Sequence, residues 1–271
     1  MHHSINLRRF APLLRPAALV AMTLLLGSAN HTAQADALSP IEQYRAYLIE
    51  QISQTLNSAK VLRERAAAHD VEGAKKAWIA SRVGWEKAEV FISGFVSDLD
   101  ENIDAWPNAL NGFHAIEARL FGANSTDVAG ATDQLIYHLT DLDIKIRQIR
   151  LNSQGLLNGA ARLAYEVGES KADGGESRYS GTSLDDMRNN VSGIELVYKT
   201  LFASPLEASD PKLAQTTRGS IQQLVSALSI SDAKRLEPGK VRTASEELIV
   251  ALQAVAPKIG LVKPTLEDIT Q

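Results

Sequence analysis

The sequence predicts an all-α protein made of helix bundles, and three observations support this fold class. Apolar residues recur with the helical period of 3.6 along most of the 271-residue chain. No segment alternates apolar and polar residues for long enough to predict a strand. About four helical runs fall on each side of a midpoint near residues 150–155, which predicts two half-bundles near 36–152 and 153–271.

The first half should begin with two long helices. The first is expected over 39–68, where a serine followed by a proline opens a run of helix formers without interior Gly or Pro. The second is expected over 71–95. An acidic stretch over 97–107 is expected to be irregular, and it leads into a short helix that carries His114.

The second half continues the helical pattern. Further helices are expected near 127–150, 154–168, 184–202, 211–228 and 241–255. A loop over 170–181, rich in Gly, Ser and charged residues, should interrupt them. The segments RVGWE at 82–86 and RLAYE at 162–166 look alike at matching places in the two halves. This single match is weak support for an internal duplication.

The N-terminal residues 1–35 are predicted to be a secretory signal peptide. A basic stretch precedes an apolar run over 17–26, and Ala33-Gln34-Ala35 has the small-x-small pattern of a cleavage site. The apolar run is shorter than the roughly 20 residues that span a membrane. We therefore expect a mature helical domain over 36–271, exported to the periplasm of a Gram-negative bacterium.

Composition excludes several classes of site and partner. The chain has no cysteine, so it has no disulfide, no thiolate ligand and no cysteine nucleophile. Loss of residues 1–35 would remove three arginines and no acid, leaving 25 basic against 32 acidic residues and a net charge of −7. This negative charge argues against nucleic acid as a partner.

The segment GFHAIE at 112–117 is the strongest sign of function. His114 and Glu117 lie three residues apart, on the helical stripe that also carries Leu110 and Phe121. This stripe should face the core, and burying two unpaired ionisable groups there would be costly. A metal ion, other side chains or a water-filled cleft must compensate them.

A second predicted helix also carries two ionisable residues on an apolar face. Glu86 and Glu89 are also three apart and share a helix face with aromatic residues. If this helix packs beside the one that carries His114, its carboxylates complete a metal site of the kind that helix bundles build. The acidic stretch can lend one more oxygen ligand, for example Asp104. Oxygen-rich ligation with a single nitrogen suits iron, and less selectively copper, zinc or manganese.

A purely structural explanation stays open beside the metal site. In that explanation, Arg82 pairs with Glu86 at the i,i+4 spacing and His114 is a satisfied core histidine. His69 and His138 have no acidic triplet near them in sequence and are expected to be structural.

The same residues resemble the imelysin-like family, and most closely its EfeM/EfeO branch of periplasmic iron-uptake proteins. The resemblance lies in the segment 78–89, the stretch 100–104, GFHAIE with LFG at 120–122, and a second region over 179–193. It covers nearly the whole mature chain. It implies two related four-helix bundles with a metal site in one of them.

Carried over by position, the resemblance makes His114 and Glu117 the motif ligands. Glu86, Glu89 and Asp104 become their companions, with Asp100 as the alternative to Asp104. It implies that the protein captures ferrous or ferric iron, with copper or zinc as other metals, for an inner-membrane iron permease and its periplasmic components. The chain resembles the short form without a cupredoxin domain.

The resemblance also allows two other functions. One is binding of an acidic polysaccharide such as alginate, for which Arg147, Arg150 and Arg162 are candidates for the rim of a basic cleft. The other is a metallopeptidase, because the family carries a peptidase label. The spacing of His114 and Glu117 differs from the zincin motif, in which two histidines at i,i+4 hold zinc, so enzymatic activity is not predicted.

Overall fold

The computed structural model describes residues 38–105 and 110–270, and every regular element in these ranges is a helix. The all-α prediction is therefore confirmed. The first elements are α1 (Pro40–Ala67), α2 (Val71–Phe95), α3 (Ser97–Ile103), α4 (Gly112–Glu117), the π-helical turn η1 (Ala118–Gly122) and α5 (Ala129–Gln148). Then follow α6 (Ser153–Glu166), η2 (Val167–Lys171), α7 (Ser183–Val197), η3 (Tyr198–Phe202), α8 (Ala203–Ser209), α9 (Pro211–Leu228), η4 (Ala233–Arg235), α10 (Pro238–Lys258) and α11 (Leu266–Thr270).

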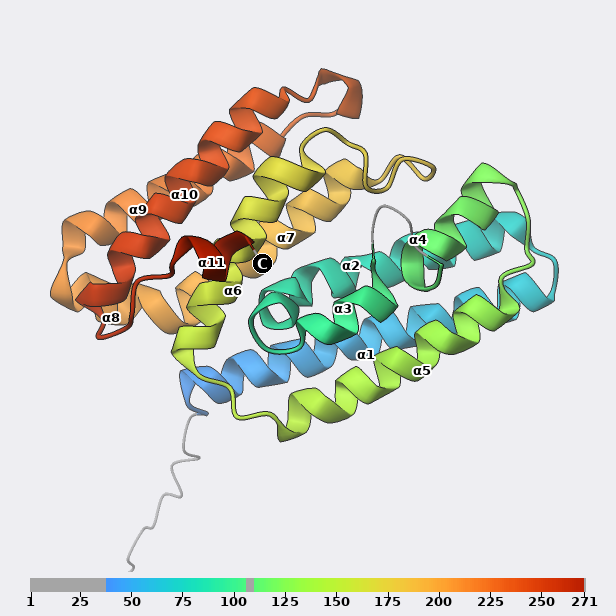
Figure 1. The fold of residues 1–271 in the computed structure, drawn as a ribbon, viewed down its shortest axis with the longest axis horizontal. Helices are drawn as coiled ribbons and strands as arrows, with labels where there is room; N and C mark the ends of the chain where they lie inside the picture. Colours follow the sequence, from blue (N-terminus) through green and yellow to red (C-terminus); the bar gives the residue numbers. More distant parts are fainter. Residues whose placement is uncertain (1–37, 106–109, 271) are drawn as a thin grey trace, which may run out of the picture. The chain divides into compact units, whose positions relative to one another are not determined.

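The helices form two groups that meet at α2. In the first group α1 packs along α2 and α5, while α3 and α4 contact both α2 and α5 (Figure 1). In the second group α6 contacts α7 and α10, and α9 closes the ring by contacting the same two helices. Helix α2 also packs against α6 and α7. Its middle is consequently buried between the two groups, which is where Glu86 and Glu89 lie.

Glycines allow α2 to approach the second group closely. A Cβ atom on Gly159 of α6 would lie 2.0 Å from the carbonyl oxygen of Val90, and one on Gly193 of α7 would lie 2.6 Å from that of Lys87. Real Cβ atoms do not approach backbone atoms this closely, so only glycine fits at these crossings. The close crossings bring Lys171 of η2, which continues α6, and Asn190 of α7 within hydrogen-bond distance of the α2 carboxylates.

The acidic stretch after α2 is not wholly irregular, so that expectation was wrong. Residues 97–103 form α3, because Leu99 and Ile103 lie four residues apart and both are buried. These apolar contacts outweigh the acidic composition of the segment. The short helices α3 and α4 together fill the place of a fourth long helix in the first group. Helices α8 and α11 were also not expected.

The predicted signal peptide over 1–35 lies outside the described residues. Among the helices that the structure describes, none combines the length and the apolar character that crossing a membrane requires.

Candidate metal site

Helix α4 carries His114, and its start depends on a glycine. Gly112 has a φ of +72°, and a Cβ there would lie 2.3 Å from the carbonyl oxygen of Ile103. The left-handed conformation and the missing side chain let α4 begin directly against the end of α3. The indole of Trp78 donates a hydrogen bond to the carbonyl oxygen of Phe113 at 3.0 Å, which fixes the first turn of α4 to α2.

The His114 imidazole is 6% exposed and lies among three carboxylates. Its Nδ1 is 3.2 Å from Glu117 Oε2, and its Nε2 is 3.2 Å from Asp104 Oδ1 and 3.6 Å from Glu176 Oε1. Among the described residues, no group forms a well-aligned hydrogen bond with Nε2. Burial by itself would lower the pKa of His114, but Asp104, Glu117 and Glu176 raise it to about 9. A metal ion that binds the ring must displace this proton.

Glu117 connects α4 to the loop over 172–182. Its Oε1 accepts hydrogen bonds from the backbone N–H groups of Tyr179 at 3.1 Å and Ser180 at 2.8 Å, and from Ser180 Oγ at 2.8 Å. Burial raises the pKa of Glu117, but the hydrogen bonds with His114 and Ser180 outweigh it and lower the pKa overall. The same loop carries Glu176, so this anchor places that carboxylate beside His114.

The structure places Asp104, rather than Asp100, beside His114. Asp104 Oδ2 accepts a hydrogen bond of 2.5 Å from the Trp85 indole, and Oδ1 pairs with Arg82. Burial raises the pKa of Asp104 to about 6, although Arg82 and His114 act in the opposite direction. Asp100, one turn earlier on α3, lines the neighbouring cavity, where burial and Asp104 raise its pKa to about 7.

Glu86 and Glu89 face two polar side chains of the second helix group. Lys171 Nζ is 3.1 Å from Glu86 Oε2 and 3.0 Å from Glu89 Oε2. Asn190 Nδ2 donates to both carboxylates, at 2.7 Å to Glu86 Oε2. The pKa of Glu89 is raised well above its usual range by burial and by the charge of Glu86.

Arg82 is a second internal cation, as the structural alternative expected. It is 1% exposed and pairs with Glu86 at the i,i+4 spacing. Its guanidinium also pairs with Asp104, and it lies 3.5 Å from Glu176 Oε1 and 3.6 Å from Asp186 Oδ2. The structure thus contains both the proposed ligands and cations that neutralise part of their charge.

Two overlapping sets of these side chains lie close enough together to be candidates for holding a metal ion. One set is Asp104, His114 and Glu176, and the other is Glu86, Glu89 and Asp104; in each set the ligand atoms lie within 4.8 Å of one another. Asp104 belongs to both sets. We call the following residues the central ion cluster: Arg82, Glu86, Glu89, Asp104, His114, Lys171 and Glu176.

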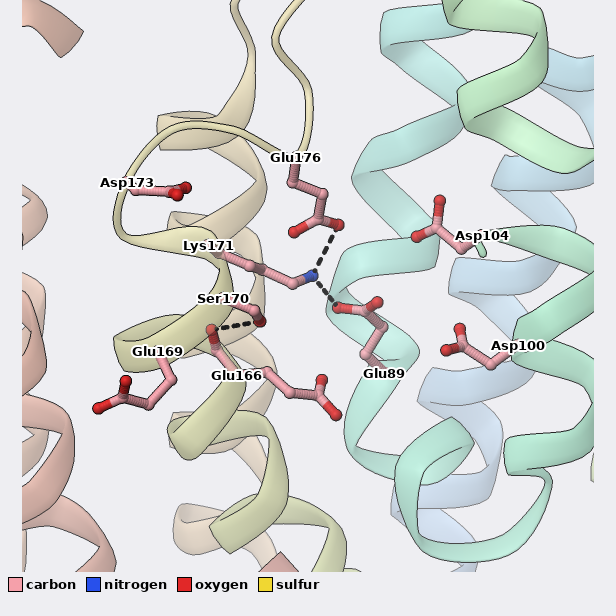
Figure 2. Close-up of a pocket in the computed structure, with 9 residues that line it drawn as sticks. All are labelled: Glu89, Asp100, Asp104, Glu166, Glu169, Ser170, Lys171, Asp173 and Glu176. Atoms are coloured by element: carbon pink, nitrogen blue, oxygen red, sulfur yellow. Dashed lines mark hydrogen bonds and ion pairs between the residues drawn. The ribbon is translucent and has the colours of Figure 1, made fainter. Parts of the chain in front are cut away.

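A cavity of about 410 Å³ adjoins the central ion cluster (Figure 2). Seven of its nine lining residues carry carboxylates, and one carries an ammonium group. They are Glu89, Asp100, Asp104, Glu166, Glu169, Ser170, Lys171, Asp173 and Glu176. Glu89, Asp104 and Glu176 belong to both the cavity wall and the candidate ligand sets. A cavity with this charge attracts cations and repels polyanions.

Sequence reasoning missed two members of the cluster, Glu176 and Lys171. Both lie in or beside the Gly- and Ser-rich loop, which has no helical periodicity to show which residues face inward. Asn190, which contacts Glu86 and Glu89, was also not predicted as part of the site. It lies in the region over 179–193 that resembles the family, and this resemblance could have pointed to it. Lys171 lies 85 residues from Glu86 in sequence, and only the packing of η2 against α2 brings them together.

Two of the three arginines suggested for a polysaccharide cleft have acidic neighbours. Arg147 forms an ion pair of 3.0 Å with Asp143, and Arg162 one of 2.9 Å with Glu166. An acidic polysaccharide at the carboxylate-lined cavity would therefore require a bridging cation. His138 belongs to neither ligand set that the described residues form.

A family model described as Imelysin, of the peptidase M75 group, matches residues 40–110 and 108–259. The iron uptake system component EfeM of Pseudomonas syringae pv. syringae is 30% identical over 189 residues, which cover 66% of this chain and 66% of EfeM. The iron uptake system component EfeO of Escherichia coli O157:H7 is 33% identical over 195 residues, covering 67% of this chain and 52% of EfeO. The matched region is thus just under two thirds of EfeM and about half of EfeO.

A solved structure shows the same fold at lower sequence similarity. It is a Parabacteroides distasonis protein provisionally described as an iron-regulated protein A precursor. The two structures superpose with a TM-score of 0.64 at 18% identity, covering 83% of this chain and 97% of the other. At this identity the likeness concerns the fold alone.

Proposed function

The chain belongs to the imelysin family, and on that premise we propose that it captures iron in the periplasm and passes it to an inner-membrane iron permease. Its relatives EfeM and EfeO are iron uptake system components. The observation that carries the proposal is the set formed by the buried Asp104 and His114 and the partly buried Glu176, beside a carboxylate-lined cavity. Iron is the cargo in this proposal.

The donor set suits iron. Two carboxylates and one imidazole provide oxygen-rich ligation with a single nitrogen, which ferrous and ferric iron accept. His114 Nε2 is buried and lies 3.2 Å from Asp104 Oδ1, so it becomes a ligand atom once its proton leaves. Glu117 contacts Nδ1 on the other side of the ring and orients it, as carboxylates do for metal-binding histidines. Copper and zinc also accept these donors.

Capture and delivery place different demands on the site. Capture requires ligands held in place. His114 lies on α4, Asp104 caps α3, and Glu117 anchors the loop that carries Glu176. Delivery requires that the ion can leave, and the cavity adjoins the ligands on one side (Figure 2). Its carboxylates also raise the local concentration of cations.

The test is calorimetric titration of the metal-stripped protein with ferrous iron under anaerobic conditions, and with ferric, copper and zinc ions. We expect tight iron binding in the unmodified protein. His114→Ala should weaken it at least about tenfold, because even residues that only support a ligand change metal affinity by 10- to 100-fold. His138→Ala is the matched control and should bind as the unmodified protein does.

Equal affinity in His114→Ala and the unmodified protein would overturn the assignment of the site. If no ion binds, and alginate binding survives chelation, the polysaccharide function would replace iron capture. Cleavage of a peptide substrate that depends on added metal would instead support the metallopeptidase.

A further inference from the structure

Lys171 occupies an unusual position for a lysine. It is 4% exposed and ends the π-helical turn η2, a type of irregularity that is frequent at functional sites. Its ammonium group lies 3.1 Å from Glu86. It also lies 3.0 Å from Glu89 and 3.3 Å from Glu176 (Figure 2). Such burial is tolerated only because these carboxylates surround the charge.

The three partners of Lys171 are the same groups that the candidate metal sets use. Glu86 and Glu89 belong to one set and Glu176 to the other. The ammonium group therefore neutralises oxygens that a metal ion needs. A metal ion and the ammonium group cannot share those oxygens, because like charges a few ångströms apart repel each other strongly in a protein interior.

Arg82 and Lys171 differ in how easily their side chains can move away from the carboxylates of the central ion cluster. Arg82 is held by ion pairs with Glu86 and Asp104, and its guanidinium lies 5.0 Å from the centre of the Phe113 ring. Lys171 has a flexible four-carbon stem and lines the cavity. The cavity wall carries other carboxylates. Asp173 is exposed, whereas Glu166 already pairs with Arg162 and Glu169 with Arg242. Figure 2 shows these three carboxylates on the side of the cavity from which Lys171 extends.

We propose that Lys171 is an exchangeable internal counter-ion, which an incoming metal cation displaces from Glu86, Glu89 and Glu176 into the cavity. The proposal rests on the proposed function, because it requires that the central ion cluster binds metal. In the metal-free protein the lysine keeps the buried carboxylates ordered and paired. In the loaded protein it competes with the cargo, so it lowers affinity and favours release.

The test compares metal affinity in Lys171→Met and Lys171→Arg with that of the unmodified protein, by titration with zinc and with anaerobic ferrous iron. Lys171→Met should bind at least about tenfold more tightly, because a competing buried charge is removed. Lys171→Arg should not gain affinity. The matched control is Lys199→Met, which removes an exposed lysine and should change affinity less than about twofold.

If Lys171 has only a structural role, the stability and the metal affinity of the variants should differ from these expectations. In that case Lys171→Met would lose stability and would bind metal no more tightly than the unmodified protein, which would overturn the proposal. If the unmodified protein itself binds no metal, the proposed function fails instead. Our proposal further expects metal to raise the melting temperature of Lys171→Met by more than it raises that of the unmodified protein.

A measurement on the unmodified protein covers the case in which Lys171→Met does not fold. An amine-reactive acetylating reagent should label Lys171 slowly in the metal-free protein, where the ammonium group is buried and paired. Labelling of Lys171, measured by peptide mass spectrometry, should increase severalfold on saturation with zinc, while labelling of Lys199 stays constant. Unchanged or reduced labelling of Lys171 on zinc binding would refute the displacement.

Discussion

Replacing Glu117 should release the loop over 172–182 from the metal site. In Glu117→Ala, two backbone N–H groups and the Ser180 hydroxyl lose a charged acceptor that lies at 2.8 to 3.1 Å. Removing one partner of such a buried charged network costs about 4 kcal/mol of unfolding free energy. For a domain of this size that loss lowers the melting temperature by roughly 8–16 °C.

Glu117→Gln is the matched variant, because its side-chain carbonyl oxygen can still accept from Tyr179 and Ser180. We expect it to lose less than about 2 kcal/mol, since only the charge is removed. Melting followed by circular dichroism measures both variants. Trypsin cleavage after the exposed Arg178 reports release of the loop directly, and it should accelerate in Glu117→Ala alone. Equal melting temperatures for the two variants, or equal cleavage rates, would refute the anchoring role of the carboxylate.

Two further predictions follow from the same structure. Zinc affinity should rise between pH 6 and pH 8, because the pKa of His114 is raised to about 9 and a bound proton must leave before the metal binds. Zinc titrations at three pH values test this prediction. An affinity that does not change with pH would contradict it. Gly159→Ala should lower the unfolding free energy by about 2 kcal/mol, because the new Cβ would meet the Val90 carbonyl oxygen at 2.0 Å. Gly219→Ala should instead stabilise the protein by up to about 1 kcal/mol, because Gly219 lies in the middle of α9 and its new Cβ would meet nothing within 4 Å. Chemical denaturation measures both variants, and a change in unfolding free energy of the same sign in both would contradict the packing argument.

Much of the fold could be predicted from local sequence patterns. The helical period follows from backbone geometry over a few residues, so the bounds of α1, α2 and α9 could be predicted closely. The acidic segment that became α3 could not, because its helix depends on burial of Leu99 and Ile103 against distant residues. Tertiary contacts overrode its composition there.

The sequence by itself determined the all-α class and the absence of thiol chemistry, and it predicted five candidate ligands, His114, Glu117, Glu86, Glu89 and Asp104. Four of these candidates were found because a charged residue on an apolar helical stripe is anomalous, whereas Asp104 came from the acidic stretch and the family resemblance. Only the tertiary structure decided which groups compensate them. Glu176 and Lys171 reach the cluster through long-range packing, and whether an oxygen meets a proton, an ammonium group or a metal ion depends on distance and burial.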